Sequence, residues 1–179
     1  MKRRAVFLDR DGVVNRVILR GGKPYPPAGM EELEILPGVP EALEALRRAG
    51  YCLIVVSNQP DVARGTLDRG VVETMNRRLH AELRLDAVYV CWHDDRDGCL
   101  CRKPRPGMLI DAAAEFGLDL RTSFMVGDRW RDVEAGKRAG CTTILVDYGY
   151  DEKLTVEPDI RVRSLAEAAG RILNAEAKS

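Results

Sequence analysis

Short apolar runs alternate with longer amphipathic stretches along the chain. The runs are a few residues long, and most of them end at a polar residue; they cover residues 5–9, 52–57, 87–91, 124–128 and 142–147. Uninterrupted apolar runs of this length are typical of strands that are buried on both faces of a parallel sheet. The pattern therefore predicts a mainly parallel sheet.

Apolar residues recur at helical spacing between these runs. The stretches with this spacing are 39–46, 72–83, 109–116, 130–140 and 165–172. Gly117 lies where the third helix would end, and Ser164 precedes the last one as an N-cap. Strands that alternate with helices predict right-handed crossovers and a Rossmann-like, doubly wound α/β domain, in which ligands bind at the carboxyl ends of the strands.

One long segment, residues 10–37, has no clear periodicity and contains several glycines and prolines. A loop of that length in a compact domain is usually functional. No other segment has room for a large cap domain, and 179 residues suit a single domain that spans residues 1–179.

Composition and charge narrow the class of protein. Apolar residues make up 45% of the chain, which excludes disorder as the main state. No apolar run approaches the roughly 20 residues of a membrane helix, and the basic start lacks the apolar stretch of a signal peptide. The net charge is zero and aromatic residues are 6% of the chain, which argues against nucleic-acid binding. We expect a cytoplasmic monomer that binds neither nucleic acid nor membrane.

The ends of the apolar runs carry candidate chemistry. Asp9 and Asp11 follow the first run, Ser57 ends the second, Lys103 lies beyond the third and Asp128 ends the fourth. Two neighbouring carboxylates repel each other unless a proton or a cation such as Mg²⁺ lies between them. Each residue alone could be a turn, a cap or a solvated charge, but together they supply what phosphoryl transfer requires.

Four segments at these positions read DRDGVVN, SNQ, CRKP and VGDRWRDVEAGKRAG. They resemble the four motifs of the haloacid dehalogenase-like (HAD) phosphatases. The resemblance implies that Asp9 attacks phosphorus to form an aspartyl phosphate, and that Asp11 protonates the leaving oxygen and later activates water. It also implies that Ser57 and Lys103 hold the phosphoryl oxygens.

The same resemblance implies a Mg²⁺ site. The ion would be held by the carboxylates of Asp9 and Asp128 and by the main-chain carbonyl of Asp11, with Asp132 orienting these groups. Gly127 and Gly136 are expected to allow close packing of the backbone.

A second cluster of metal-binding residue types lies in CWHDDRDGCLCRKP, which contains Cys91, His93, Cys99 and Cys101. Cys91 and His93 are two residues apart, and so are Cys99 and Cys101. In extended chain the members of each pair therefore project to the same side. Three thiolates and one imidazole complete a closed, structural Zn²⁺ site. The alternative is a set of buried free thiols beside a loop histidine. Cys52 and Cys141 lie in apolar runs and are expected in the core.

This loop resembles that of the heptose bisphosphate phosphatases and of the related histidinol-phosphate phosphatases. The resemblance implies a phosphorylated sugar as substrate and a set of substrate-binding residues, namely Arg10, Asn15, Asn58, Gln59, Arg102 and Arg129. Arg64 matches a basic position of the substrate-binding loop in the family, and a solvated surface charge explains it equally well. The chain departs from the family pattern at Pro60, Asp61, Trp92 and Arg129, which leaves histidinol phosphate as an alternative substrate. A phospho-accepting signalling domain and a zinc-stabilised binding domain are alternatives of another class.

Overall fold

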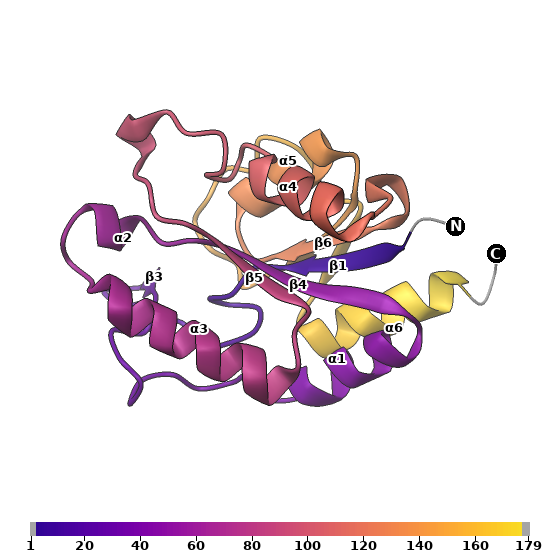
Figure 1. The fold of residues 1–179 in the computed structure, drawn as a ribbon, viewed down its shortest axis with the longest axis horizontal. Coiled ribbons are helices and arrows are strands. Elements are labelled where there is room, and N and C mark those ends of the chain that lie inside the picture. The colour runs from indigo at the N-terminus through magenta and orange to yellow at the C-terminus, as the bar shows by residue number, and fades with distance from the viewer. Residues whose placement is uncertain (1–2, 177–179) are drawn as a thin grey trace.

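A computed structural model describes residues 3–176. Its centre is a six-stranded parallel sheet in the order β5-β4-β1-β6-β7-β8 (Figure 1). The strands are β1 (Arg4–Leu8), β4 (Tyr51–Asn58), β5 (Ala87–Cys91), β6 (Phe124–Gly127), β7 (Thr142–Val146) and β8 (Ile160–Val162). This arrangement confirms the predicted doubly wound α/β architecture.

Helices cover both faces of the sheet (Figure 1). On one face lie α1 (Val39–Arg48), α3 (Arg69–Leu83) and α6 (Leu165–Glu176). On the other lie α4 (Gly107–Phe116) and α5 (Trp130–Ala139). Successive side chains of β1 therefore enter different cores: Val6 and Leu8 pack with the first group, whereas Ala5 and Phe7 pack with the second. Burial on both faces explains why the strands read as uninterrupted apolar runs.

The predicted helix ends are observed at two positions. The Glu167 amide donates to Ser164 Oγ at 3.2 Å, so Ser164 caps α6 as expected. Gly117 follows α4 in the left-handed conformation, with φ 64°. None of the helices within residues 3–176 combines the length and the hydropathy that crossing a membrane requires.

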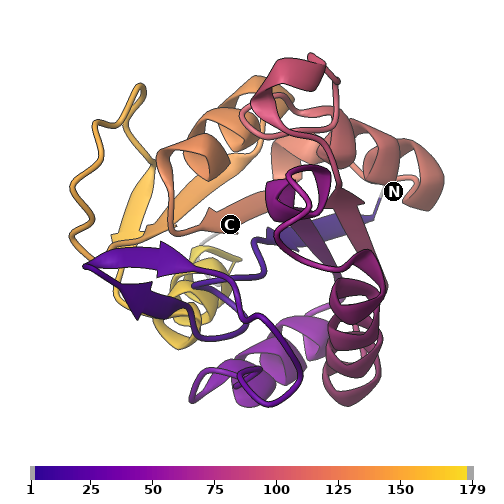
Figure 2. The ribbon, with the colours of Figure 1, turned by 90° about the vertical axis from the view of Figure 1, so that its left-hand side faces the viewer.

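The periodicity of the sequence did not predict several short elements. The segment 10–37 contains a hairpin of β2 (Ile18–Arg20) and β3 (Lys23–Tyr25), and the other short elements are α2 (Pro60–Ala63), η1 (Asp95–Asp97), η2 (Leu120–Thr122) and β8. No large cap domain is present in the described chain, as predicted. The hairpin, α2 and the loop after β5 instead surround the carboxyl edge of the sheet, which Figure 2 shows face on.

The strand order reverses between β1 and β6, which are adjacent in the sheet although most of the chain separates them. The connections from these two strands lead to opposite sides, so a crevice forms at their carboxyl ends. Asp9 follows β1 and Asp128 follows β6. The fold thus brings the first and fourth predicted motifs to the same place.

Candidate active site

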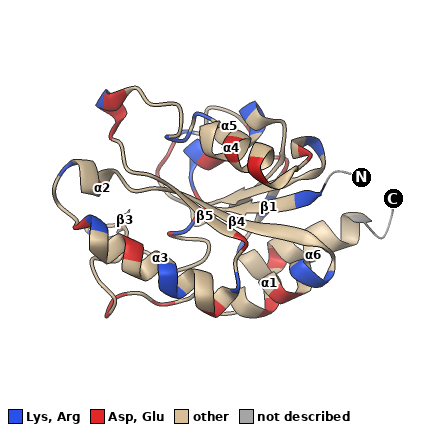
Figure 3. Ribbon diagram, in the orientation of Figure 1, with Lys and Arg blue, Asp and Glu red and all other residues tan. Residues whose placement is uncertain are grey.

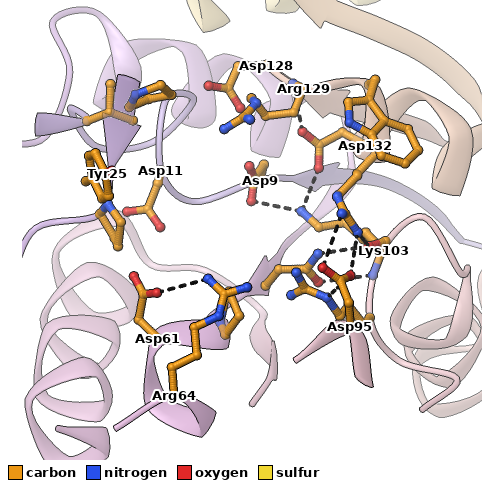
Figure 4. Close-up of a pocket in the computed structure, with 18 residues that line it drawn as sticks. Asp9, Asp11, Tyr25, Asp61, Arg64, Asp95, Lys103, Asp128, Arg129 and Asp132 are labelled. Atoms are coloured by element: carbon orange, nitrogen blue, oxygen red, sulfur yellow. Dashed lines mark hydrogen bonds and ion pairs between the residues drawn. The ribbon is translucent and has the colours of Figure 1, made fainter. Parts of the chain in front are cut away.

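A cavity of about 340 Å³ opens at this crevice (Figure 4). Its walls come from the β2–β3 hairpin, α2, the loop after β5 and the start of α5. Of the site residues predicted from the sequence, those that line it are Asp9, Asp11, Asn58, Arg102, Lys103, Asp128, Arg129 and Asp132. Residues from four distant segments therefore meet in one depression.

Lys103 lies at the floor of the cavity, and its side chain is only 2% exposed. Its Nζ donates to Asp9 Oδ1 at 2.9 Å and to the carbonyl of Val56 at 2.7 Å, and it pairs with Asp132 Oδ1 at 2.6 Å (Figure 4). Burial alone would lower the pKa of Lys103, but the carboxylates of Asp132 and Asp9 outweigh it and raise that pKa above its ordinary value. The lysine therefore places a fixed positive charge beside Asp9.

Three carboxylates converge next to this lysine: those of Asp128 and Asp132 are buried, and that of Asp9 is largely buried. Oxygens of Asp9, Asp128 and Asp132 lie within 4.8 Å of one another. Burial, and after it the charge of Asp132, raises the pKa of Asp9 to about 6. Burial and the charge of Asp9 likewise raise the pKa of Asp128 well above its usual range. One lysine does not balance three acids, so the cluster favours an additional cation.

The donor set fits Mg²⁺, which prefers carboxylate and carbonyl oxygens. Asp128 Oδ1 is buried and has no hydrogen-bond partner among the described residues. Asp132 is already engaged, because Oδ1 pairs with Lys103 and Oδ2 accepts from the Arg129 amide at 3.0 Å. Asp9 and Asp128 are thus the carboxylates available to a cation.

Gly12 and Gly127 allow the backbone to approach this cluster. A Cβ atom on Gly12 would lie 2.1 Å from Asp128 Oδ2, and one on Gly127 would lie 2.0 Å from the Cβ of Asp132. Gly136 packs in the same way against Thr143. The expectation that Gly127 and Gly136 serve close packing is therefore confirmed.

Asp11 is held by a set of donors behind the cavity. Its carboxylate accepts from Arg10 Nε at 3.2 Å and Nη2 at 3.0 Å, from Asn15 Nδ2 at 2.9 Å and from Gln59 Nε2 at 2.8 Å. Arg10, Asn15 and Gln59 are at most 1% exposed. These three predicted substrate-binding residues are not among those that line the cavity, and each of them donates to Asp11.

Ser57 and Asn58 end β4 and face different partners. Ser57 is fully buried, and its Oγ accepts from Gln59 Nε2 at 2.9 Å. Asn58 pairs with the backbone of Lys103: its Oδ1 accepts from the amide and its Nδ2 donates to the carbonyl, both at 3.0 Å. Asn58 thereby ties the lysine to the end of β4.

Two arginines predicted to bind substrate lie at the rim in ion pairs. Arg102 Nε donates to Asp95 Oδ1 at 2.8 Å. Arg129 pairs with Glu152, which raises the pKa of the guanidinium. Sequence reasoning missed Asp95 and Arg131, which also lines the cavity and donates to Asp95 Oδ1 at 3.0 Å. Their positions, inside the cysteine-rich loop and inside the fourth motif, were the available signal.

The departures from the family pattern also have definite places. Pro60 begins α2, and Pro60, Asp61 and Arg64 line the cavity. Arg64 pairs with Asp61 and, at 2.6 Å, with Asp94 of the loop after β5. Trp92 instead packs against the core, half-buried. Of the four departures, Pro60, Asp61 and Arg129 therefore line the cavity, and Trp92 does not.

The second cluster forms as predicted from spacing. Sγ of Cys101 lies 3.1 Å from Cys91 Sγ and 3.5 Å from Cys99 Sγ, and His93 Nδ1 lies 3.4 Å from Cys101 Sγ. A tetrahedral Zn²⁺ with Zn–S bonds of about 2.3 Å requires edges a little under 4 Å, so the four ligand atoms suit that geometry. Cys52 and Cys141 are buried in the core, as expected.

Comparison with known proteins agrees with this geometry. Residues 100–168 match a family model described as HAD-hydrolase-like. A heptose-1,7-bisphosphate 7-phosphatase from Bordetella bronchiseptica is 36% identical over 153 residues, which cover 83% of this chain and 83% of that protein. One from Thermosynechococcus vestitus is 36% identical and covers 94% of both chains.

The chain belongs to the heptose-1,7-bisphosphate 7-phosphatase family of HAD-like hydrolases. Among solved structures, the B. bronchiseptica D,D-heptose 1,7-bisphosphate phosphatase, in complex with magnesium and phosphate, superposes with a TM-score of 0.83 at 32% identity and covers 96% of this chain and 99% of that one. A HAD-like phosphatase from Mesorhizobium loti has a TM-score of 0.77 at 32% identity and covers 97% of this chain and 86% of that one.

Membership of this family makes the protein a phosphatase, as the motifs predicted. The signalling and binding-module alternatives are thereby set aside. Positions of Lys or Arg and positions of Asp or Glu both occur along the helices drawn in Figure 3, in keeping with the net charge of zero.

Proposed function

We propose that this phosphatase removes the 7-phosphate of D-glycero-D-manno-heptose 1,7-bisphosphate. The observation that carries the proposal is the Asp9–Lys103 pair at the floor of a cavity that Asp11 also lines. A nucleophile, a buried cation and a second acid are the parts that phosphomonoester hydrolysis requires. The names of the relatives support the sugar, and the arginines at the rim suit a substrate with a second phosphate.

In this proposal Asp9 is the nucleophile. Within the described residues, Oδ1 receives both hydrogen bonds of the carboxylate, from the Arg10 amide and from Lys103 Nζ. We therefore assign Oδ2 as the attacking oxygen. The Asp9 oxygen forms a bond to phosphorus while the bond from phosphorus to the sugar oxygen breaks, and Lys103 balances the negative charge that approaches.

Asp11 moves the protons. As an acid it gives a proton to the leaving sugar oxygen, and as a base it then takes one from the water that attacks the aspartyl phosphate. The second step releases inorganic phosphate and restores the Asp9 carboxylate. Arg10, Asn15 and Gln59 hold the Asp11 carboxylate for both transfers, and Ser57 is proposed to bind a phosphoryl oxygen.

Mg²⁺ is the proposed cofactor of the acidic cluster. Asp9, Asp128 and the main-chain carbonyl of Asp11 would hold it, and Asp132 would orient Lys103 beside it. When bound, the ion supplies positive charge that offsets the phosphoryl oxygens and the clustered carboxylates. The relative of known structure that contains magnesium and phosphate supports this assignment.

Zn²⁺ is the proposed ion of the Cys91–His93–Cys99–Cys101 cluster, in a structural role. All four ligand positions are protein atoms, so none is open for chemistry. The cluster would fix the loop that carries Arg102 and Lys103. Thiol ligands must stay reduced, which suits the cytoplasm as the proposed location. The proposed nucleophile, the buried lysine and the acids of the mechanism all come from one chain, and we propose that a monomer suffices for activity.

Specificity is proposed to come from the rim. Asn58, Arg102 and Arg129 line the cavity and offer amide and guanidinium groups to the sugar and its second phosphate. The test is phosphate release with Mg²⁺ from heptose 1,7-bisphosphate and from histidinol phosphate at matched concentrations, with Asp9→Asn as the blank.

A kcat/KM advantage of about a hundredfold for the heptose, or roughly 2.7 kcal/mol, is the expected result. The reverse preference would replace the proposed substrate with histidinol phosphate and leave the catalytic assignments in place. Weak, equal turnover of both substrates would refute the substrate assignment and indicate that Pro60 and Asp61 have changed the specificity of the site.

A further inference from the structure

Helix α3 carries one polar residue on its buried face. The buried residues of this helix are Val72, Met75, Asn76, Leu79 and Leu83. Asn76 is 8% exposed. Asparagine is a poor helix former, and a buried amide is costly unless it is hydrogen-bonded. Packing of the core alone therefore gives no reason for an amide at this position.

The amide of Asn76 bonds to Arg10. Asn76 Oδ1 accepts from Arg10 Nη1 at 2.9 Å, and the contact is buried. The side chain of Arg10 is fully buried as well. Its remaining described bonds go to Asp11, from Nε at 3.2 Å and from Nη2 at 3.0 Å. One guanidinium thus links the helix to the second carboxylate of the active site.

The guanidinium is planar and rigid, so fixing one nitrogen fixes the direction of the others. Asn76 holds the Nη1 edge, and the opposite edge grips Asp11. Without the Asn76 acceptor, Arg10 would bury an unpaired N–H group, and the plane of the guanidinium could rotate to satisfy it. The orientation of the Asp11 carboxylate would then change as well.

We propose that Asn76 is a positioning residue for proton transfer: it orients Asp11 through Arg10. The inference rests on the proposed role of Asp11 as the acid that protonates the leaving oxygen. Asn76 is not among the residues that line the cavity. Its effect should therefore scale with how strongly the leaving group needs a proton.

Two substrates separate this effect from a general loss of activity. A sugar alkoxide is a poor leaving group that requires a proton, whereas p-nitrophenolate departs without one. The ratio kcat/KM reports transition-state stabilisation relative to free enzyme and substrate, and thus only steps up to the first irreversible one, here formation of the aspartyl phosphate. Slow hydrolysis of that intermediate does not enter this ratio.

The experiment compares Asn76→Leu with Asn76→Asp on heptose 1,7-bisphosphate and on p-nitrophenyl phosphate. Asn76→Leu should lower kcat/KM for the sugar phosphate at least about tenfold, as misplacement of a catalytic group does. It should leave kcat/KM for the aryl phosphate within about threefold. Asn76→Asp restores an oxygen acceptor for Arg10 and should recover the sugar phosphate activity.

Leu83→Ala is the matched control, because it removes buried side-chain atoms from the last residue of the same helix, about two turns beyond Asn76. It should lower the melting temperature without changing the ratio between the two substrates. An equal loss on both substrates in Asn76→Leu, or no loss on either, would overturn the proposal. Failure of Asn76→Asp to recover activity would overturn it too.

Asp11→Asn, measured in parallel, tests the proposed function separately. If Asp11→Asn lowers kcat/KM strongly for the sugar phosphate and little for the aryl phosphate, Asp11 is the acid. An unchanged kcat/KM for Asn76→Leu on both substrates then counts against Asn76 alone. If Asp11→Asn shows no such selectivity, the role of Asp11 itself is wrong.

Discussion

Replacing Asp9, the proposed nucleophile, should stabilise the protein when magnesium is absent. The Asp9 side chain is 13% exposed, and its pKa is raised from the ordinary 3.8 to about 6 by burial and by Asp132. In Asp9→Asn the carboxylate becomes a neutral amide of nearly the same shape. Its Oδ1 can still accept from the Arg10 amide and from Lys103 Nζ. The substitution thus removes a buried negative charge and keeps both hydrogen bonds.

The size of the expected stabilisation follows from the shift in the pKa of Asp9. A pKa raised from 3.8 to about 6 corresponds to about 3 kcal/mol, at about 1.4 kcal/mol per tenfold change. Between about pH 4 and pH 6 the folded state binds more protons at Asp9 than the unfolded state does. The contribution of this carboxyl to stability is therefore full below about pH 4 and is lost as the pH rises through 6.

The assay is urea unfolding of wild type and Asp9→Asn from pH 4 to pH 8 in buffer without Mg²⁺ and without chelator, which leaves the cysteine cluster undisturbed. The two proteins should be equally stable near pH 4, and the variant should be more stable by up to about 3 kcal/mol at pH 7. Added Mg²⁺ should stabilise wild type in proportion to its binding and largely close the gap.

Asp151→Asn, which changes an exposed aspartate, is the control and should show no such pH dependence. The reasoning would be refuted if the gap between wild type and Asp9→Asn stayed constant between pH 4 and pH 7, or if Mg²⁺ stabilised the variant as much as wild type.

Three other predictions concern the second acid, the thiol cluster and close packing. Asp11→Asn should lower kcat/KM on the sugar phosphate by about 10²–10⁴ with an unchanged circular dichroism spectrum; near-normal turnover would contradict its role. Cys101→Ser should contain less zinc than wild type, measured by elemental analysis, and should melt at a lower temperature. Wild-type protein that holds no zinc but has full activity would refute the structural zinc site. Gly127→Ala should cost about 1–3 kcal/mol in urea unfolding, because its Cβ would overlap Asp132, and an unchanged midpoint would show that the strand end can relax.

The sequence predicted the parts of the site that follow from strand ends. Asp9 and Asp128 each come directly after an apolar run, and a parallel sheet brings such positions to one edge. The cysteine cluster was equally predictable, since the spacing of its members sets their geometry. These inferences depend on neighbours in the chain and on a regular fold, which is why they transfer from sequence to structure.

The roles of Arg10, Asn15 and Gln59 could not be predicted from strand ends or residue spacing. Each is a polar residue near a strand end, where it can face either the cavity or the back of a neighbouring side chain. Packing around Asp11 decides between the two, and the partner Asn76 is 66 residues away from Arg10. No local pattern records that contact.

The β2–β3 hairpin was missed for a different reason. Its strands are only three residues long, too short for a clear alternation. The turn itself carried a signal, because Gly21 and Gly22 have φ of 58° and 77°, as a type I′ turn requires, and a Gly-Gly pair favours that turn. Strand β8 is equally short and had no comparable marker.

The division of the cavity between floor and rim has a consequence for how such enzymes diversify. The floor residue Lys103 is buried and bonded to Val56 of β4, to Asp9 and to Asp132, so changing it disturbs folding and chemistry together. Among the rim residues, Tyr25 lies in the β2–β3 hairpin, Arg64 directly follows the four-residue helix α2, and Asp95 lies in the loop that contains the cysteine cluster. Mutations there can accumulate while the core stays intact. New substrate preferences can therefore arise by drift at the rim, without passing through variants that fail to fold.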